Sequence, residues 1–172
     1  MSIPREQREV LETMGVALLL LQNAERVIRL CMTVVLQKQP LTLDVLQQQE
    51  EAERNKTIGY FLSELRKRAT IDETFDALLK EFLKNRNDFV HDLSRVPSWS
   101  LRTPEEAAQS REFVHCLIQQ TEEVLKILVG LIAAWQEQVG SPEPLLPSHE
   151  WFSEIDEFYK PVANHVFRGK GT

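Results

Sequence analysis

The sequence has few of the residues that mark fibrous, disulfide-bonded or membrane-spanning proteins. It holds only six glycines and eight prolines in 172 residues, too few for a collagen-like or low-complexity chain. Its two cysteines, Cys31 and Cys116, lack both the number of a disulfide framework and the spacing of a zinc site. The longest apolar run, Val16 to Leu21, covers six residues, whereas a membrane span needs about 20. We therefore expect a globular protein with two buried, reduced core thiols.

A secretory signal and a uniformly basic surface are also missing. The first residues are polar and carry both signs of charge, so we expect a cytoplasmic protein with no membrane contact. The net charge of −6 excludes a wholly basic nucleic-acid coat protein. The charge is uneven, however. Residues 54–102 hold ten Lys and Arg against seven Asp and Glu, and the remainder holds ten against nineteen. A polyanion would therefore meet the middle of the chain, although ordinary variation among solvated faces explains the same pattern.

The common catalytic signatures are absent. The sequence contains no glycine-rich phosphate loop, no Gly-x-Ser-x-Gly, no His-Glu-x-x-His and no dinucleotide-binding fingerprint. A di-iron helical bundle needs paired Glu-x-x-His motifs, and only Glu112-Phe-Val-His115 occurs. His115 beside a core stripe is the ordinary interpretation of that motif. We therefore expect no metal and no cofactor.

Apolar residues recur at helical spacing, and no window alternates with the period of a strand. The spacing predicts helices over about 4–37 and 57–68, with a shorter stretch after Thr42. A capping box at 70–73, or Asp72 alone, opens the next helix. The first helix is apolar around much of its circumference, so we expect it to be buried on more than one side, by its own chain or by another subunit. Its main stripe comprises Val10, Met14, Leu18, Leu21, Ile28, Met32 and Val35.

The last long helix has clear start and stop signals. Thr103 is placed to cap it, Pro104 suits the first helical position, and Glu106 completes a capping box. Gly140 and Pro142 stop it. The chain therefore predicts an all-α fold, an up-and-down bundle of four to five helices over residues 1–140. Residues 141–172 form a proline-rich linker and a short aromatic helix near 151–159, which packs on the bundle or on a partner.

One short segment points to chemistry. Arg86 lies near the end of the third predicted long helix, and its neighbours three and four residues away are Phe82, Leu83, Phe89 and Val90. Because none of these is a carboxylate, Arg86 lacks the usual ion pair along the helix. Its partner must be another helix, water or a ligand anion. Asn87 and His91 lie one turn apart, so Arg86, Asn87 and His91 share one broad helix face.

These residue types suit metal-independent cleavage of RNA, in which the 2′-hydroxyl of the RNA is the nucleophile. Such a reaction needs a group that exchanges protons near neutral pH and a fixed cation for the phosphate. Histidine is the side chain that titrates in that range, and general acid–base catalysis is typically worth about 10²–10⁴ in rate. Arginine binds phosphate oxygens with a planar fork. Asn87 could orient the imidazole or donate to the phosphate.

The segment resembles the motif of the HEPN superfamily: Arg, four to six residues, then His, often with a polar residue directly after the Arg. Arg86, Asn87 and His91 match these positions, and residues 57–93 resemble the central helix pair of the family. The resemblance implies a homodimer with a composite cleft and, in many members, metal-independent endoribonuclease activity in toxins or anti-phage effectors. In the branch with nucleotidyltransferase antitoxins a Tyr follows as His-x-Tyr, and the antitoxin modifies this Tyr. This chain has Leu93 at that position, so we do not expect an antitoxin to silence it in this way.

Further residues near the motif are candidates for binding RNA. Lys84, Arg95 and Arg102 supply cations, and Trp99 between the two arginines could stack on an unpaired base, or could simply cover the core. Other interpretations stay open for the motif itself. Arg86 could pair with a carboxylate of another helix while Asn87 and His91 cap the helix end. The protein could also be an inactive HEPN-like domain that binds a protein, a nucleotide or RNA, with an antitoxin or regulatory protein as a possible partner.

Overall fold

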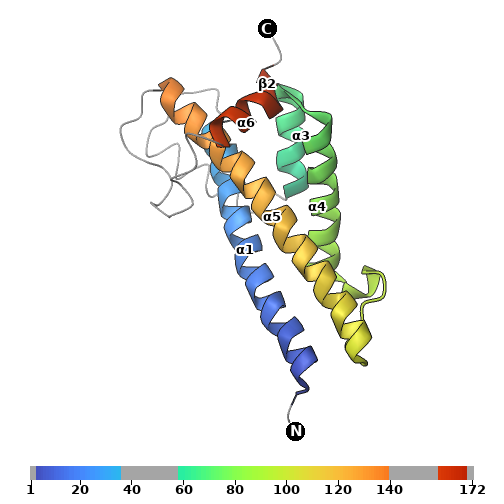
Figure 1. The fold of residues 1–172 in the computed structure, drawn as a ribbon. Helices are drawn as coiled ribbons and strands as arrows, with labels where there is room; N and C mark the ends of the chain where they lie inside the picture. Colours follow the sequence, from blue (N-terminus) through green and yellow to red (C-terminus); the bar gives the residue numbers. More distant parts are fainter. Residues whose placement is uncertain (1–2, 36–57, 140–158, 170–172) are drawn as a thin grey trace. The chain divides into compact units, whose positions relative to one another are not determined.

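The computed structural model describes residues 3–35, 58–139 and 159–169, and in these ranges the fold is all-α, as the sequence predicts (Figure 1). The described helices are α1 (Arg5–Val35), α3 (Ile58–Arg68), α4 (Glu73–His91), α5 (Pro104–Val139) and α6 (Lys160–Val166). A 3₁₀ helix, η1 (Leu93–Arg95), follows α4. None of the described helices combines the length and the hydropathy that crossing a bilayer would require. The stretch after Thr42 and the aromatic segment 151–158 lie outside the described residues.

The chain divides into two compact units, and helices α1, α4 and α5 contribute residues to both. The first unit comprises Met1–Ala24 and Ala77–Val124, and the second comprises Glu25–Asp76 and Leu125–Thr172. Every residue that the sequence analysis assigns to catalysis or RNA binding belongs to the first unit.

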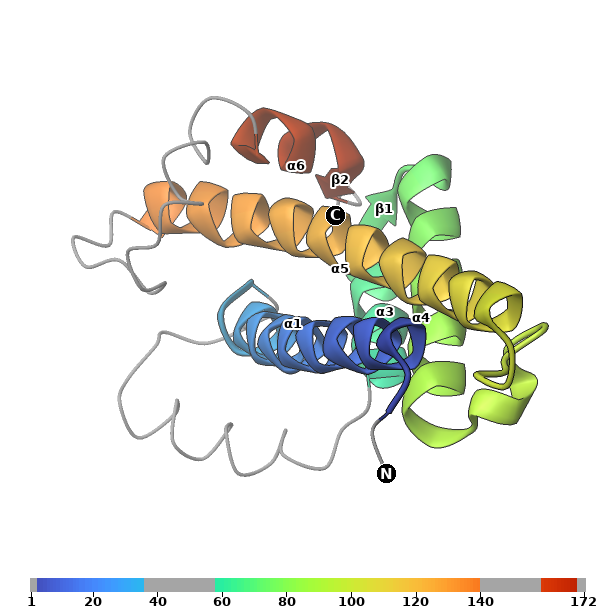
Figure 2. The same ribbon diagram turned by 60° about the horizontal axis from the view of Figure 1, so that its bottom comes forward.

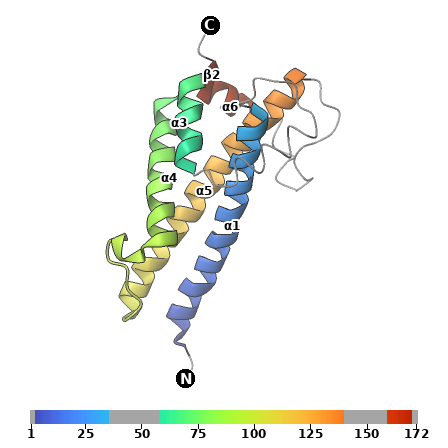
Figure 3. The same ribbon diagram turned by 180° about the vertical axis from the view of Figure 1, so that it is seen from behind.

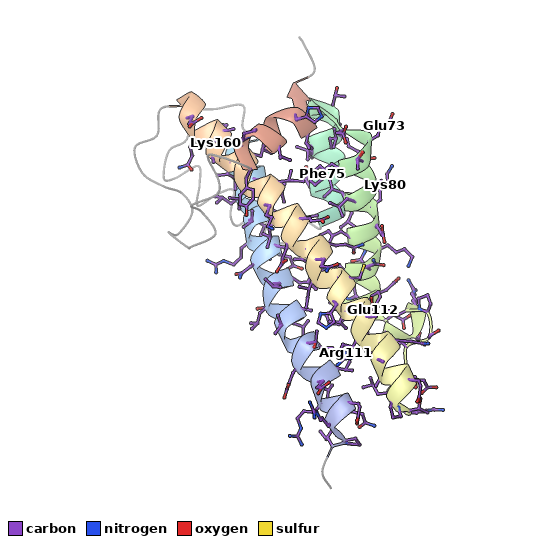
Figure 4. All side chains as sticks on the ribbon, in the orientation of Figure 1. Glu73, Phe75, Lys80, Arg111, Glu112 and Lys160 are labelled. Carbon is purple, nitrogen blue, oxygen red and sulfur yellow. The ribbon has the colours of Figure 1, made fainter. Side chains whose placement is uncertain are left out.

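The core of the first unit is built from one apolar face of each of its helices. Along α1 the buried positions recur with helical spacing, and α4 and α5 supply larger side chains. The buried set includes Val10, Ala17, Leu21, Leu79, Phe82, Phe89, Val114, Leu117 and Val124. Polar contacts add to this packing. Asn85 Nδ2 donates to Gln120 Oε1 at 3.0 Å, and Arg111, labelled in Figure 4, donates to Glu9 Oε2 at 2.7 Å.

The predicted start of α5 is confirmed in detail. The backbone N–H of Glu106 donates to Thr103 Oγ1 at 3.3 Å, and the N–H of Thr103 donates to Glu106 Oε2 at 3.3 Å. These reciprocal bonds are the predicted capping box. For α4 the second of the two predicted caps is correct. Asp72 Oδ1 accepts the N–H groups of Thr74 and Phe75, which lowers the pKa of the Asp72 carboxyl.

The second unit contains a short β-ribbon that the sequence did not predict (Figure 2). Strands β1 (Ala69–Ile71) and β2 (Phe167–Gly169) pair antiparallel, and Asp72 N continues the pairing with Val166 O at 2.9 Å. Three residues are too few for an alternating pattern to stand out. In the same unit α6 lies along the C-terminal part of α5 in Figure 1, and Tyr159 packs against Val129 and Ala133.

Leu18 of the predicted stripe is 43% exposed in the single chain, and Leu11, Val16 and Leu19 are also exposed, because only the opposite face of α1 enters the core. This chain therefore does not bury the first helix on more than one side, and burial by another subunit stays a prediction. One prediction about the cysteines is wrong. Cys31 is buried as predicted, but Cys116 is exposed, since it lies on the outer face of α5 between buried Val114 and Leu117.

Candidate functional site

The structure brings Arg86, Asn87 and His91 together at the C-terminal end of α4. Nη1 of Arg86 donates to Oδ1 of Asn87 at 3.0 Å and lies 3.3 Å from Nε2 of His91. Arg86 is half-buried, while Asn87 and His91 are exposed. One guanidinium nitrogen therefore joins the amide and the imidazole in a cluster that solvent can reach.

Nη1 of Arg86 lies beside Nε2 of His91. A guanidinium has donors and no acceptor, so in a hydrogen bond between the two groups Nε2 is the acceptor. The contact therefore places the guanidinium at the ring nitrogen that faces it.

The packing of α4 determines where Arg86 lies. Phe82 and Phe89, which lie four and three residues away, are buried in the core. Burial of these two rings fixes the rotation of α4 about its axis and leaves Arg86 at the edge of the apolar face. Its Nε is buried, whereas Nη1 reaches the surface residues Asn87 and His91.

Lys84 and Arg95, which are predicted to bind substrate, each form an ion pair with a carboxylate. Lys84 Nζ contacts Asp88 Oδ2 at 3.0 Å, and Arg95 Nε contacts Asp92 Oδ2 at 3.0 Å. Asp92 also accepts bonds from the hydroxyl and N–H of Ser94, and the Ser94 hydroxyl is the main reason that the pKa of Asp92 is lowered. These pairs position α4 and η1 and leave less cationic charge for a polyanion.

Further ion pairs reduce the free basic charge of residues 54–102. They join Arg66 to Asp76 at 2.6 Å and Lys67 to Glu64 at 2.6 Å. Among the residues that the structure describes, Arg102 forms no ion pair with a carboxylate. Arg102 is therefore an exposed cation of the first unit that can meet an external anion.

Trp99 and Arg102 lie in the loop between α4 and α5, which Figure 3 shows from behind. They border one open hollow of about 610 Å³, whose other lining residues are Gln7, Ser100, Leu101 and Glu106. Trp99 is half-buried and makes an edge-to-face contact with Phe113, with ring centroids 6.2 Å apart. The lining does not include Arg86, Asn87 or His91, so the predicted residues fall into two groups.

Gln7, Glu106 and Ser110, which shape this hollow, were not among the predicted functional residues. Gln7 lies 94 positions before Leu101, whose carbonyl accepts its Nε2–H at 2.9 Å. No local pattern could reveal such a contact. The capping box predicts Glu106 at the start of the last long helix. The same signal therefore places Glu106 next to the loop that precedes this helix.

Glu112 and His115 of the single Glu-x-x-His motif lie on α5, and both side chains are exposed. Within the described ranges no group of three His, Cys, Asp or Glu side chains is arranged to hold a metal ion. No family model, curated protein or solved structure matches this chain. The class that the fold defines is an all-α protein, and its function has to be argued from the cluster on α4.

Proposed function

We propose that the protein is a metal-independent endoribonuclease of HEPN type, with Arg86, Asn87 and His91 as its catalytic residues. The observation that supports this most is the joint contact of Arg86 Nη1 with Asn87 at 3.0 Å and His91 at 3.3 Å. A cation and a titratable imidazole, both within reach of solvent, are the two groups that cleavage through the 2′-hydroxyl requires.

In this proposal the RNA supplies its own nucleophile. His91 takes the proton of a 2′-hydroxyl, the 2′-oxygen bonds to the adjacent phosphorus, and the P–O5′ bond breaks. The departing 5′-oxygen takes a proton from water or from the partner subunit's His91. The products are a 2′,3′-cyclic phosphate and a 5′-hydroxyl, so protons and bonds balance without a metal.

Arg86 has two tasks in this scheme. Its guanidinium binds the phosphate oxygens and stabilises the charge that grows on them during attack. Because Nη1 contacts His91 Nε2 in the free protein, binding of a phosphate would draw the guanidinium away from the imidazole. The Nε2 lone pair would then be available to the 2′-hydroxyl, while Asn87 keeps its place one turn from His91.

The test is cleavage of a mixed RNA pool in EDTA by wild type, Arg86→Ala and His91→Ala. Wild type should produce fragments that end in a 2′,3′-cyclic phosphate, and both variants should lose the activity while keeping their helical circular dichroism. Removing one transition-state donor or one acid–base group typically costs about 10²–10³ in rate. Cleavage by His91→Ala at the wild-type rate would contradict the proposal.

The biological setting belongs to the same proposal. The enzyme would act in the cytoplasm as a toxin or anti-phage effector, as a homodimer in which two clusters border one cleft. Growth arrest on induction of wild type, and normal growth with His91→Ala, is the expected outcome in cells. Light scattering should give twice the chain mass of 19.9 kDa, and a monomer would remove the composite cleft.

One observation favours a second function, a non-catalytic interaction domain. Leu11, Val16, Leu18 and Leu19 of α1 are 43–65% exposed in the single chain. Grouped apolar side chains on a surface often mark contacts between proteins, and an antitoxin or regulatory protein would be such a partner. Leu19→Glu would then abolish binding of the partner, while His91→Ala would have no effect in cells.

A further inference from the structure

The hollow beside the loop between α4 and α5 is separate from the catalytic cluster. Its volume of about 610 Å³ lies within the range of small-molecule sites, which is about 300–1,000 Å³. Gln7 of α1, the loop residues Trp99 to Arg102, and Glu106 of α5 line it. All of these residues belong to the first unit.

The walls of the hollow are fixed by hydrogen bonds before any ligand binds. Ser110 Oγ accepts from Ser100 N at 3.1 Å and donates to Ser100 O at 2.9 Å, while Gln7 Nε2 donates to Leu101 O. Ser98, directly before Trp99, adopts a φ of 60°, which a residue other than glycine rarely does. A rim held in this way loses little conformational entropy when a ligand binds.

Trp99 gives the hollow a flat aromatic surface. Its edge-to-face contact with Phe113, at an interplanar angle of 84°, holds the indole while leaving it partly exposed. Unpaired nucleobases stack on such rings whatever their identity, because every base has a π-face.

The polar groups of the hollow determine which edges of a base they can bind. Ser100 Oγ and Thr103 N both donate to Oε2 of Glu106, and the backbone N–H of Arg102 also interacts with this carboxylate. The bonds from Ser100 and Thr103 do not use Oε1, which can accept from a ligand. The Ser100 hydroxyl lowers the pKa of Glu106, and the carboxylate is therefore ionised at neutral pH. Gln7 uses its amide N–H₂ on Leu101, which leaves its carbonyl oxygen as an acceptor.

Acceptors at this position match a base that presents an amino group. Cytosine, adenine and guanine carry exocyclic N–H₂ donors, and uracil does not. The exposed guanidinium of Arg102 lines the same hollow and can bind a phosphate, which offsets the repulsion between that phosphate and the Glu106 carboxylate.

We propose that this hollow binds one unpaired, amino-bearing base of a single-stranded RNA, stacked on Trp99 with its amino group toward Glu106 and Gln7, and with Arg102 on a neighbouring phosphate. The inference rests on the proposed function in taking RNA as the ligand. It adds a specificity subsite outside the catalytic cluster and favours cytosine over uracil, two bases of nearly equal size.

The test uses fluorescent hexanucleotides of 2′-O-methylcytidine and of 2′-O-methyluridine, which lack the 2′-hydroxyl and cannot be cleaved. Binding is measured by fluorescence anisotropy. The cytidine hexamer should bind more tightly to wild type than the uridine hexamer, and Glu106→Gln, which can still form the capping box, should abolish that preference. Trp99→Leu should weaken binding of either hexamer by about 5- to 100-fold.

Two controls keep the test decisive. Trp135→Leu replaces another half-buried tryptophan, which lies in α5 and in the second unit. This variant should leave binding unchanged. Arg102→Gln alters an exposed side chain, and it should lower the slope of log affinity against log salt concentration by about one. It therefore tests the site even if Trp99→Leu fails to fold.

The results separate this inference from the proposed function. Equal binding of hexamers by wild type, Trp99→Leu and Arg102→Gln overturns the subsite, and so does an absence of binding to wild type. Cleavage of unmodified RNA that depends on His91 would leave the catalytic proposal standing in both cases. Weaker binding in both hollow variants, with Trp135→Leu binding as wild type does, supports the subsite independently of cleavage.

Discussion

Alanine at Gly130 should destabilise the second unit, although alanine is the better helix former. A Cβ at this position of α5 would lie 2.3 Å from the carbonyl oxygen of Tyr159 and 2.6 Å from its carbonyl carbon. These are backbone atoms, so no side-chain rotation can relieve the overlap. The start of α6 must move away from α5, or α5 must bend.

The two opposing terms can be compared. Replacing Gly by Ala inside a helix ordinarily stabilises by about 0.5–1 kcal/mol. Overpacking a close contact costs about 1–3 kcal/mol. The expected net effect of Gly130→Ala is therefore a loss of about 0–2.5 kcal/mol, centred near about 1 kcal/mol, together with faster amide hydrogen exchange in α6.

Gly15→Ala is the matched control. Gly15 also lies inside a long helix, but it is exposed, and nothing lies within 4 Å of a Cβ built there. This variant should gain about 0.5–1 kcal/mol. Urea unfolding followed by circular dichroism measures both. If Gly130→Ala gains as much stability as Gly15→Ala, the close approach of Tyr159 to α5 is refuted.

Three further predictions follow from single contacts. Asp72→Ala should lower the melting temperature at neutral pH, because N–H groups of the first turn of α4 bind the ionised carboxylate and lower its pKa. The difference in melting temperature from wild type should shrink once the pH drops below 3.8, the ordinary pKa of the group, and vanish as the pH falls through the lowered pKa. An unchanged difference at pH 2 would contradict this. A thiol reagent should modify one cysteine of the native chain, exposed Cys116, and both after denaturation, since burial shields Cys31 and raises its pKa; two fast native thiols would refute the placement. Arg86→Lys should keep the fold but lose at least about tenfold in RNA cleavage, because an ammonium cannot bind two phosphate oxygens as a planar fork does; full activity would exclude that role.

The helices and their starts could be predicted because their signals are local. Apolar spacing places α1 and α5 to within a few residues, and the capping box at Thr103 consists of side chains only three positions apart. The cluster on α4 was predictable for the same reason. Arg86 and His91 are five residues apart on one helix, so helical geometry alone puts them on one broad face.

The features that the sequence did not predict depend on contacts between distant segments. The ribbon joins Thr70 to Arg168, and the hollow depends on Gln7 meeting Leu101. The sequence could not show which apolar residues of α1 the chain itself leaves exposed, as it does Leu18, because periodicity gives the width of a stripe and not the part that a neighbour covers. The carboxylates that engage Lys84 and Arg95 are local, but which rotamers they adopt depends on the end of α4 and on η1.

The most direct test of the catalytic claim compares two exposed histidines of the first unit. Wild type, His91→Ala and His115→Ala are incubated with one RNA oligonucleotide of mixed sequence in EDTA. The masses of the products are then measured by mass spectrometry. The account predicts fragments with 2′,3′-cyclic phosphate ends from wild type and His115→Ala, and intact RNA from His91→Ala. Equal cleavage by all three proteins, or cleavage by none, would contradict a ribonuclease site at Arg86, Asn87 and His91.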